Sequence, residues 1–140
     1  MPDQPAKIIE PLAKFHVKVH SQYRVTFPKE TRQAFGIREG DYVVLILRKI
    51  HGQPPTAIRR AVLFLKISRN GVMVLPKELT TSFEIEVGEI IEILLIRHVP
   101  APRIPVPEIS SIEALAISHK HGFVPISEQQ EAEILRLAGS

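Results

Sequence analysis

The sequence predicts a mainly β protein with short helices, made of two copies of one unit in a single chain and followed by a helical tail. Three observations lead to this fold class: a repeat at a fixed offset, β-branched runs bounded by turn residues, and a proline-rich break near residue 99. Residues 18–47 align without a gap with residues 66–95, at an offset of 48. A fixed internal period decides the architecture, and two copies are too few for a solenoid. We therefore interpret them as two halves of one domain.

Each copy has the same order of predicted elements. A short alternating strand (16–20 and 65–67) is followed by a polar turn and a second strand (24–27 and 72–75). Proline then ends the strand and suits the first turn of a short helix, predicted at 29–35 and 77–83. A long strand rich in leucine and β-branched residues follows at 42–47 and 90–96. Residues 42–50 and 57–67 are predicted to form one hairpin, whose second arm is also the first strand of the second copy.

A long motif in the first copy resembles a known family. Residues 24–41 read R-V-x-F-P-K-E-x-R-x-x-F-G-I-x-x-G-D, which is similar to the AbrB/SpoVT family of swapped-hairpin transcription regulators, including MazE-type antitoxins. The resemblance covers residues 15–50 and 64–99. It implies a swapped-hairpin β-barrel of two interleaved copies, usually from two chains, that binds double-stranded DNA with one basic face. One copy of roughly 35 residues is too short to bury a core alone. Since both copies lie in one chain here, we expect an intrachain pseudo-dimer.

The other segments are placed around this barrel. Residues 1–14 are predicted to be an N-terminal arm, residues 15–99 the barrel, residues 100–109 a proline-rich linker and residues 110–140 a helical tail. Capping-box patterns at Ser110 and Ser127 predict two short amphipathic helices in the tail. Two such helices cannot form a core alone. We therefore expect the tail to pack on the barrel, to self-associate or to bind a protein partner.

Charge is distributed unevenly along the chain. The formal net charge is +3, but residues 7–69 hold thirteen Lys and Arg against four Asp and Glu, while residues 70–140 hold five against ten. A basic face attracts phosphate and releases counterions, but the charge alone fits a solvated basic surface equally well, and it is the resemblance of the motif that favours a nucleic-acid partner. The chain has no cysteine, no apolar run of membrane-spanning length and no signal-peptide core near its start. We expect a cytoplasmic protein with no membrane partner.

Seven residues are candidate DNA contacts. Arg24 and Arg32 stand where the resemblance implies arginines on the reading face, and Gln33 lies beside Arg32. Arginine and glutamine can form paired hydrogen bonds with base edges. Four further cations suit phosphate contact: Lys18, Lys29, Arg69 and Lys77.

The second copy has lost part of this chemistry. Val72 replaces the counterpart of Arg24, and Thr80 and Thr81 replace the counterparts of Arg32 and Gln33. We therefore expect DNA-binding capacity to be weighted towards the first copy, without a preference for palindromes. Tyr23 stands where the family usually has glycine, which predicts that the first turn differs from a tight turn with positive φ or is longer.

No catalytic or cofactor motif is present in the sequence. It has no P-loop, G-x-G-x-x-G, H-E-x-x-H or nucleophile elbow, and His119 with His121 is too few ligands for a metal site. We expect no enzyme activity, cofactor or metal. The first hypothesis is a DNA-binding transcription regulator or chromatin-associated protein. The alternatives are a MazE-type antitoxin whose tail binds a toxin, and a protein-interaction module that has lost DNA binding.

Overall fold

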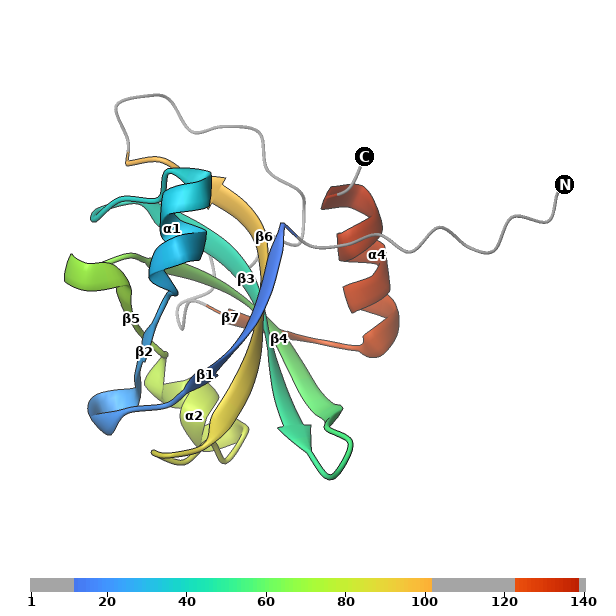
Figure 1. The fold of residues 1–140 in the computed structure, drawn as a ribbon. Helices are drawn as coiled ribbons and strands as arrows, with labels where there is room; N and C mark the ends of the chain where they lie inside the picture. The colour runs from blue at the N-terminus through green and yellow to red at the C-terminus, as the bar shows by residue number, and fades with distance from the viewer. Residues whose placement is uncertain (1–11, 102–122, 139–140) are drawn as a thin grey trace, which may run out of the picture.

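The computed structural model describes residues 12–101 and 123–138 of the chain (Figure 1). Strands alternate with short helices through both copies, and a strand and a longer helix follow at the C-terminal end. The elements are β1 (Ala13–Lys18), η1 (Ser21–Tyr23), β2 (Arg24–Thr26), α1 (Lys29–Phe35), β3 (Tyr42–His51), β4 (Thr56–Lys66), η2 (Arg69–Gly71), β5 (Val72–Val74), α2 (Lys77–Ser82), β6 (Ile90–Val99), β7 (Phe123–Ile126) and α4 (Glu128–Ala138).

Two antiparallel sheets form the frame. The larger sheet has the strand order β1-β6-β3-β4-β7, and the smaller is the ribbon β2-β5. In Figure 1, the ribbon and helices α1 and α2 lie on one side of the larger sheet, and α4 lies on the other. The predicted fold class, mainly β with short helices and a C-terminal helix, is confirmed.

Strand pairing joins the two copies throughout, and its register repeats at the offset of the sequence copies. Lys18 of β1 pairs with Ile90 of β6, and the residues 48 positions away, Lys66 and Tyr42, pair in the hairpin β3–β4. In the ribbon, Val25 lies opposite its own counterpart Met73. In the large sheet, Ile46 lies opposite its counterpart Leu94. Neither copy therefore forms a sheet from its own strands alone.

Side chains that alternate along the strands form two hydrophobic cores, one on each face of the large sheet. Val43, Leu45 and Leu47 of β3 face the ribbon and join the larger core, which also contains Val25 and Met73. The intervening residues point to the opposite face, because successive strand side chains alternate. There a smaller core lies under α4: Val44, Ile46, Val62, Leu94, Ile96 and Ile134.

The turn before β2 differs from the sequence-based expectation. Gln22 and Tyr23 have φ of 61° and 56°, and their counterparts Asn70 and Gly71 have 61° and 77°. The two turns thus share one conformation, and the prediction of a different or longer turn at Tyr23 was wrong. A non-glycine residue with positive φ persists only where its surroundings hold it. Here the Tyr23 carbonyl accepts a hydrogen bond from the Leu75 N–H at 3.0 Å, as the Gly71 carbonyl does from the Phe27 N–H at 2.8 Å.

The ends of the barrel also differ from the predicted boundaries. Strand β1 begins at Ala13, so it includes the last two residues of the predicted arm. Strand β7 was not predicted; it pairs with the outer edge of β4 from Arg60 to Leu63. Residues 1–11 of the predicted arm, residues 102–109 of the linker and the tail helix predicted near Ser110 lie outside the described residues.

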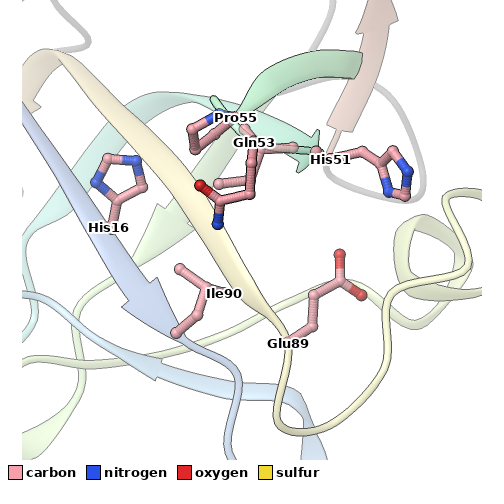
Figure 2. A pocket seen from close by; sticks show the side chains of 8 residues that line it. His16, His51, Gln53, Pro55, Glu89 and Ile90 are labelled. Carbon is pink, nitrogen blue, oxygen red and sulfur yellow. The ribbon is translucent and has the colours of Figure 1, made fainter.

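The side of the large sheet that faces α4 is only partly covered. Beyond the helix, an open groove lies between the tip of the β3–β4 hairpin and the start of β6 (Figure 2). His16 and Ile90 line its sheet side, and they share the face of Glu92 and Leu94 by strand alternation. The tip supplies His51, Gly52, Gln53 and Pro55.

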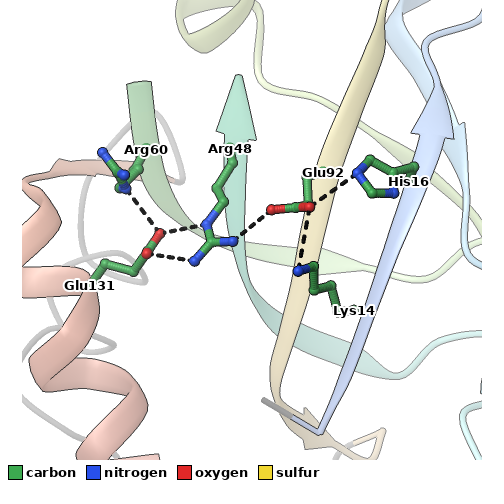
Figure 3. A network of polar contacts seen from close by, with 6 residues as sticks. All are labelled: Lys14, His16, Arg48, Arg60, Glu92 and Glu131. Atoms are coloured by element: carbon green, nitrogen blue, oxygen red, sulfur yellow. Dashed lines mark hydrogen bonds and ion pairs between the residues drawn. The ribbon is translucent and has the colours of Figure 1, made fainter. Parts of the chain in front are cut away.

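A network of ion pairs fixes α4 to the sheet (Figure 3). Arg48 on β3 donates two hydrogen bonds to Glu131 on α4, at 2.9 and 2.7 Å, and a third to Glu92 on β6, at 2.6 Å. Arg60 Nε lies 3.2 Å from Glu131 Oε2 as an ion pair without hydrogen-bond alignment. The hydrogen bonds to Glu131 raise the pKa of Arg48 above its ordinary value in spite of partial burial, and Glu92 adds to the effect. The packing of this part of the tail on the barrel follows from these pairs and from buried Ile134.

The start of α4 has the predicted capping box. The Ser127 hydroxyl accepts a hydrogen bond from the Gln130 N–H at 3.1 Å, and the Gln130 side chain accepts one from the Ser127 N–H at 2.8 Å. These reciprocal bonds satisfy two backbone donors that the first helical turn leaves without partners. The helix therefore begins at the residue that the sequence indicated.

Asp41 joins the turn before β3 to the end of β6. Its carboxylate accepts hydrogen bonds from the Arg38 N–H at 2.8 Å and the Ala101 N–H at 2.8 Å, and contacts His98 Nε2 at 2.7 Å. Burial raises the pKa of Asp41, but the bonds from Arg38, His98 and Ala101 outweigh burial and hold it below its ordinary value. The counterpart Glu89 repeats one of these contacts, accepting from the Glu86 N–H at 3.0 Å.

No helix within the described residues is long and apolar enough to cross a membrane.

The substitution Glu131→Gln is expected to loosen α4. It removes the charge that pairs with Arg48 and leaves a partly buried cation with one carboxylate partner instead of two. We expect a loss of about 3 kcal/mol in the free energy of unfolding. Faster amide exchange should appear in α4 and β7. The matched control is Glu133→Gln, because Glu133 pairs with Arg136 on the exposed side of the same helix; its effect should stay within about 0.5 kcal/mol. Equal effects of the two substitutions would contradict the role given to Arg48.

The substitution Asp41→Asn is expected to change stability in a pH-dependent way. Because the folded-state pKa lies below the unfolded one, the carboxylate stabilises the fold above the unfolded pKa, and this stabilisation is lost as the pH falls through the folded value. At about pH 7 we expect a loss of about 1–3 kcal/mol. The difference from the unsubstituted protein should shrink below about pH 4, measured by urea unfolding. Glu39→Gln, in the same turn and exposed, is the control.

Candidate nucleic-acid interface

The outward face of the β2–β5 ribbon is the centre of the candidate interface. Val25 and Met73 point into the larger core, so the residues beside them point outwards. The outward residues form two cross-strand pairs, Arg24 with Val74 and Thr26 with Val72. Val74 is 55% exposed. The centre of this face therefore combines one cation, one hydroxyl and two apolar side chains.

One end of the ribbon brings Arg24 and Lys77 together from different copies. Arg24 begins β2, and the Leu75–Tyr23 backbone bond holds the start of α2, where Lys77 lies, beside the first turn. Arg24 is exposed and bends back on its turn, with Nε 3.3 Å from the Ser21 carbonyl. Within residues 12–101 and 123–138, no carboxylate pairs with it. Lys18 lies at this end too, because His20 after it pairs with Arg24.

At the other end of the ribbon, the turn comes from the second copy and the helix from the first. The Phe27–Gly71 backbone bond holds the start of α1, where Lys29 lies, beside the second turn, which carries Arg69. Lys29 and Arg69 are both exposed. Lys66, the counterpart of Lys18, ends β4 just before this turn and is exposed as well. Lys66 was missing from the predicted contacts, although the offset of 48 from Lys18 indicated it.

Arg32 has a structural role at this second end. Its Nε donates a hydrogen bond to the Phe27 carbonyl at 3.0 Å, and the side chain is half-buried. A Cβ on Gly71 would collide with the Arg32 guanidinium, so the glycine of the second copy makes room for the arginine of the first. Gln33, next in α1, is exposed. The structure thus separates the adjacent predicted contacts Arg32 and Gln33: one is held against the ribbon and one is in solvent.

The first end contains the reverse combination of side-chain sizes. Tyr23 is the counterpart of Gly71, and Thr80 is the counterpart of Arg32. Tyr23 packs against the larger core, while Thr80 is buried and donates to the Lys77 carbonyl at 2.8 Å. A large residue in the turn therefore accompanies a small one in the helix at one end, and the opposite holds at the other end.

The cations of the two copies are interleaved along the ribbon, and the predicted weighting of DNA binding towards the first copy stays a prediction. Because β2 and β5 run antiparallel, each end of the ribbon is built from the turn of one copy and the helix of the other. Arg24 and Lys18 lie with Lys77, and Arg69 lies with Lys29 and Arg32. Each end of the ribbon thus has cations from both copies.

Other cations of the basic half lie away from the ribbon face. Arg59 and Arg60 point to opposite sides of β4, because successive side chains of a strand alternate. Arg59 lies 5.7 Å from the Phe83 ring centre and donates to the Ser82 carbonyl at 3.1 Å. Arg60 and Arg48 pair with Glu131 on the opposite face of the sheet, and Lys49 pairs with Glu89. Much of the first-half charge is therefore used within the fold.

The described part of the chain brings no three His, Asp or Glu side chains close enough to hold a metal ion. His119 and His121 lie outside the described residues.

Two comparisons with known proteins agree with this geometry. Residues 17–51 match the family model described as antidote-toxin recognition MazE, bacterial antitoxin. That segment begins in the last two residues of β1 and runs through β2 and α1 to the end of β3. The solution structure of PHS018 from Pyrococcus horikoshii superimposes with a TM-score of 0.59 at 35% sequence identity, covering 68% of this chain and 99% of that chain. The chain belongs to the same family as PHS018. No curated protein matches the sequence.

The contact between Gly71 and Arg32 can be tested by adding a Cβ. Gly71→Ala should displace Arg32 and break its bond to the Phe27 carbonyl. Gly36→Ala is the matched control, since Gly36 has φ of 66° against 77° at Gly71 but nothing within 4 Å of an added Cβ. Both should lose about 1 kcal/mol of unfolding free energy from left-handed strain, and Gly71→Ala about 1 kcal/mol more from the lost bond. In an Arg32→Ala background this excess should vanish; an unchanged excess would show that Arg32 is not the obstacle.

Proposed function

We propose that this protein is a DNA-binding transcription regulator or chromatin-associated protein that docks the outward face of the β2–β5 ribbon on duplex DNA. The observation that carries the proposal is the set of exposed cations at both ends of the ribbon. In the described part of the chain none of them forms an ion pair with a carboxylate: Lys18, Arg24, Lys29, Lys66, Arg69 and Lys77. Such a surface supplies phosphate contacts and the counterion release that drives DNA affinity. The proposed role is binding and not catalysis.

The proposed roles of the residues follow from their positions. Arg24 lies at one end of the ribbon on its outward face and is long enough to reach a base edge in a groove, where arginine pairs with guanine. Gln33 is exposed beside the second end and can read adenine. Lys29 and Lys77 begin short helices on either side and are placed for phosphates. Arg32 has a supporting role, because its side chain lies against Gly71 of the second turn and its Nε donates a hydrogen bond to the Phe27 carbonyl after β2.

We also infer that the two copies act as an intrachain pseudo-dimer on the DNA. The registers that place Val25 opposite Met73 and Ile46 opposite Leu94 support this reading. The contact residues at equivalent positions differ, however, with Arg24 matched by Val72 and Arg69 by Ser21. A symmetric dimer reads a palindrome because its halves match. Unequal halves are suited to an asymmetric site.

A second candidate is a MazE-type antitoxin, which binds DNA with the barrel and a toxin with its tail. The match of residues 17–51 to the MazE model favours it. It requires a tail segment that is open to a partner, and α4 is instead packed on the sheet through Arg48 and Ile134. A small toxin gene next to this one, and co-purification of its product with the full chain, would favour the antitoxin.

The docking face predicts that each end contributes to DNA affinity. Arg24→Ala and Arg69→Ala should each weaken binding to a duplex, and each should reduce the slope of log affinity against log salt by about 1 if the arginine contacts one phosphate. Arg136→Ala is the matched control. It removes the same charge from exposed α4, on the other side of the sheet (Figure 1), so its salt slope should not change.

Fluorescence anisotropy over a salt series measures both quantities. A random duplex gives the electrostatic part, and a genomic DNA pool gives any preferred sequence. If Arg24→Ala and Arg69→Ala behaved like Arg136→Ala, the ribbon face would not be the interface.

A further inference from the structure

One edge of the large sheet has a strand partner and the equivalent edge has none within the described residues. Strand β4 corresponds to β1 at the offset of 48, and its outer edge pairs with β7 from Arg60 to Leu63. The corresponding stretch is Leu12 to Phe15. Among residues 12–101 and 123–138, β1 pairs with β6 alone and forms the edge of the sheet. The fold thus has two equivalent strand edges, one on β4 and one on β1, and β7 pairs with the edge of β4.

The register shows which backbone groups of β1 face outwards. The Val19 N–H donates to the Glu89 carbonyl at 2.8 Å, which continues the pairing of β1 with β6. Hydrogen-bonded and non-hydrogen-bonded pairs alternate along an antiparallel ladder. The odd-numbered residues of β1 therefore bond to β6, and the N–H and C=O groups of Lys14 and His16 point to the outer edge. An exposed row of this kind is a template for another strand.

The side chains along this edge separate by chemistry. Lys14, His16 and Lys18 are all exposed and share one face of the strand. Lys14 and His16 are 53% and 48% exposed, and both contact Glu92, which also pairs with Arg48. Lys14, His16 and Arg48 thus share Glu92, and Lys18 has no carboxylate partner among the described residues. On the other face, half-buried Phe15 packs edge-on against Phe27 at 4.8 Å between ring centres.

We propose that the outer edge of β1 binds an extended acidic segment of a partner protein as an added antiparallel strand. The partner's backbone pairs with Lys14 and His16. Its acidic side chains lie beside Lys14, His16 and Lys18, and its alternate apolar side chains cover Phe15, as Phe123 of β7 covers the other end of the same core. Backbone pairing supplies affinity, and alternate side chains supply specificity.

This occupant fits better than two others. A second copy of the chain, pairing β1 with β1, would set Lys14 and Lys18 against the same two cations, and like charges on facing strands repel. Duplex DNA matches the charge but offers no row of alternating donors and acceptors for the strand edge. An acidic strand offers both negative charges for the lysines and backbone donors and acceptors for the edge of β1.

The test is binding of a fluorescent Glu-Val-Glu-Val-Glu peptide to the full chain, followed by anisotropy. Two control peptides accompany it, one with alternate backbone nitrogens methylated and one with Lys in place of Glu. We expect methylation to weaken binding at least ~10-fold, because it removes strand hydrogen bonds without changing charge. The lysine peptide should not bind. Lys14→Gln should weaken binding several-fold, and Arg136→Gln, on exposed α4, should not change it.

Each other outcome overturns the proposal. Equal binding of the methylated peptide would mean that the strand face attracts anions without strand pairing. Absence of binding would mean that the edge does not accept a strand. Amide exchange of the free full chain gives a third outcome, since slow exchange at Lys14 and His16 would show that another segment of the chain, or a second copy, already pairs there. The Lys14→Gln result can be told apart from a loss of DNA binding, because Lys14 is not among the proposed DNA contacts, whereas Lys18 belongs to both surfaces.

Discussion

The structure depends on the exchange of strands between the two copies. Val25 and Met73 pair across the ribbon, and both are fully buried in the larger core. Ile46 and Leu94 pair across the large sheet and carry the smaller core under α4. A copy on its own would leave the apolar sides of these strands in water, and a unit of roughly 35 residues buries too little surface to offset its loss of conformational entropy. We therefore expect the two copies to fold together.

Within this near-symmetric frame, the differences between the copies come as compensating pairs. At one end, the large Arg32 of the first helix lies against Gly71 of the second turn. At the other end, the small Thr80 of the second helix accompanies the large Tyr23 of the first turn. If the first copy paired with itself, Arg32 would meet Tyr23 instead of glycine, and both large side chains would compete for one site. The size exchange therefore favours pairing of unlike copies, which a single chain containing one of each satisfies.

The sequence predicted most of the barrel because its signals are local or periodic. The offset of 48, the prolines before α1 and α2, and the capping box at Ser127 each correspond to an observed element. The conformation at Tyr23 was predicted wrongly, because the preference of positive φ for glycine is weaker than the constraint of pairing with Leu75. Strand β7 was missed because four residues that include a proline carry little periodicity, and what makes them a strand is the distant edge of β4.

The candidate site was predictable as a set of residues but not as an arrangement. In the sequence, Arg24 and Arg32 belong to the same copy. In the structure, the antiparallel ribbon puts Arg24 at one end with Lys77 and Arg32 at the other end with Arg69. Which copy a residue belongs to therefore says little about which part of the DNA it would meet.

The same reasoning applies to the tail. Glu131 is one of several glutamates in a helix, and only the position of Arg48 on β3 distinguishes it from Glu133, which lies two residues away and faces solvent.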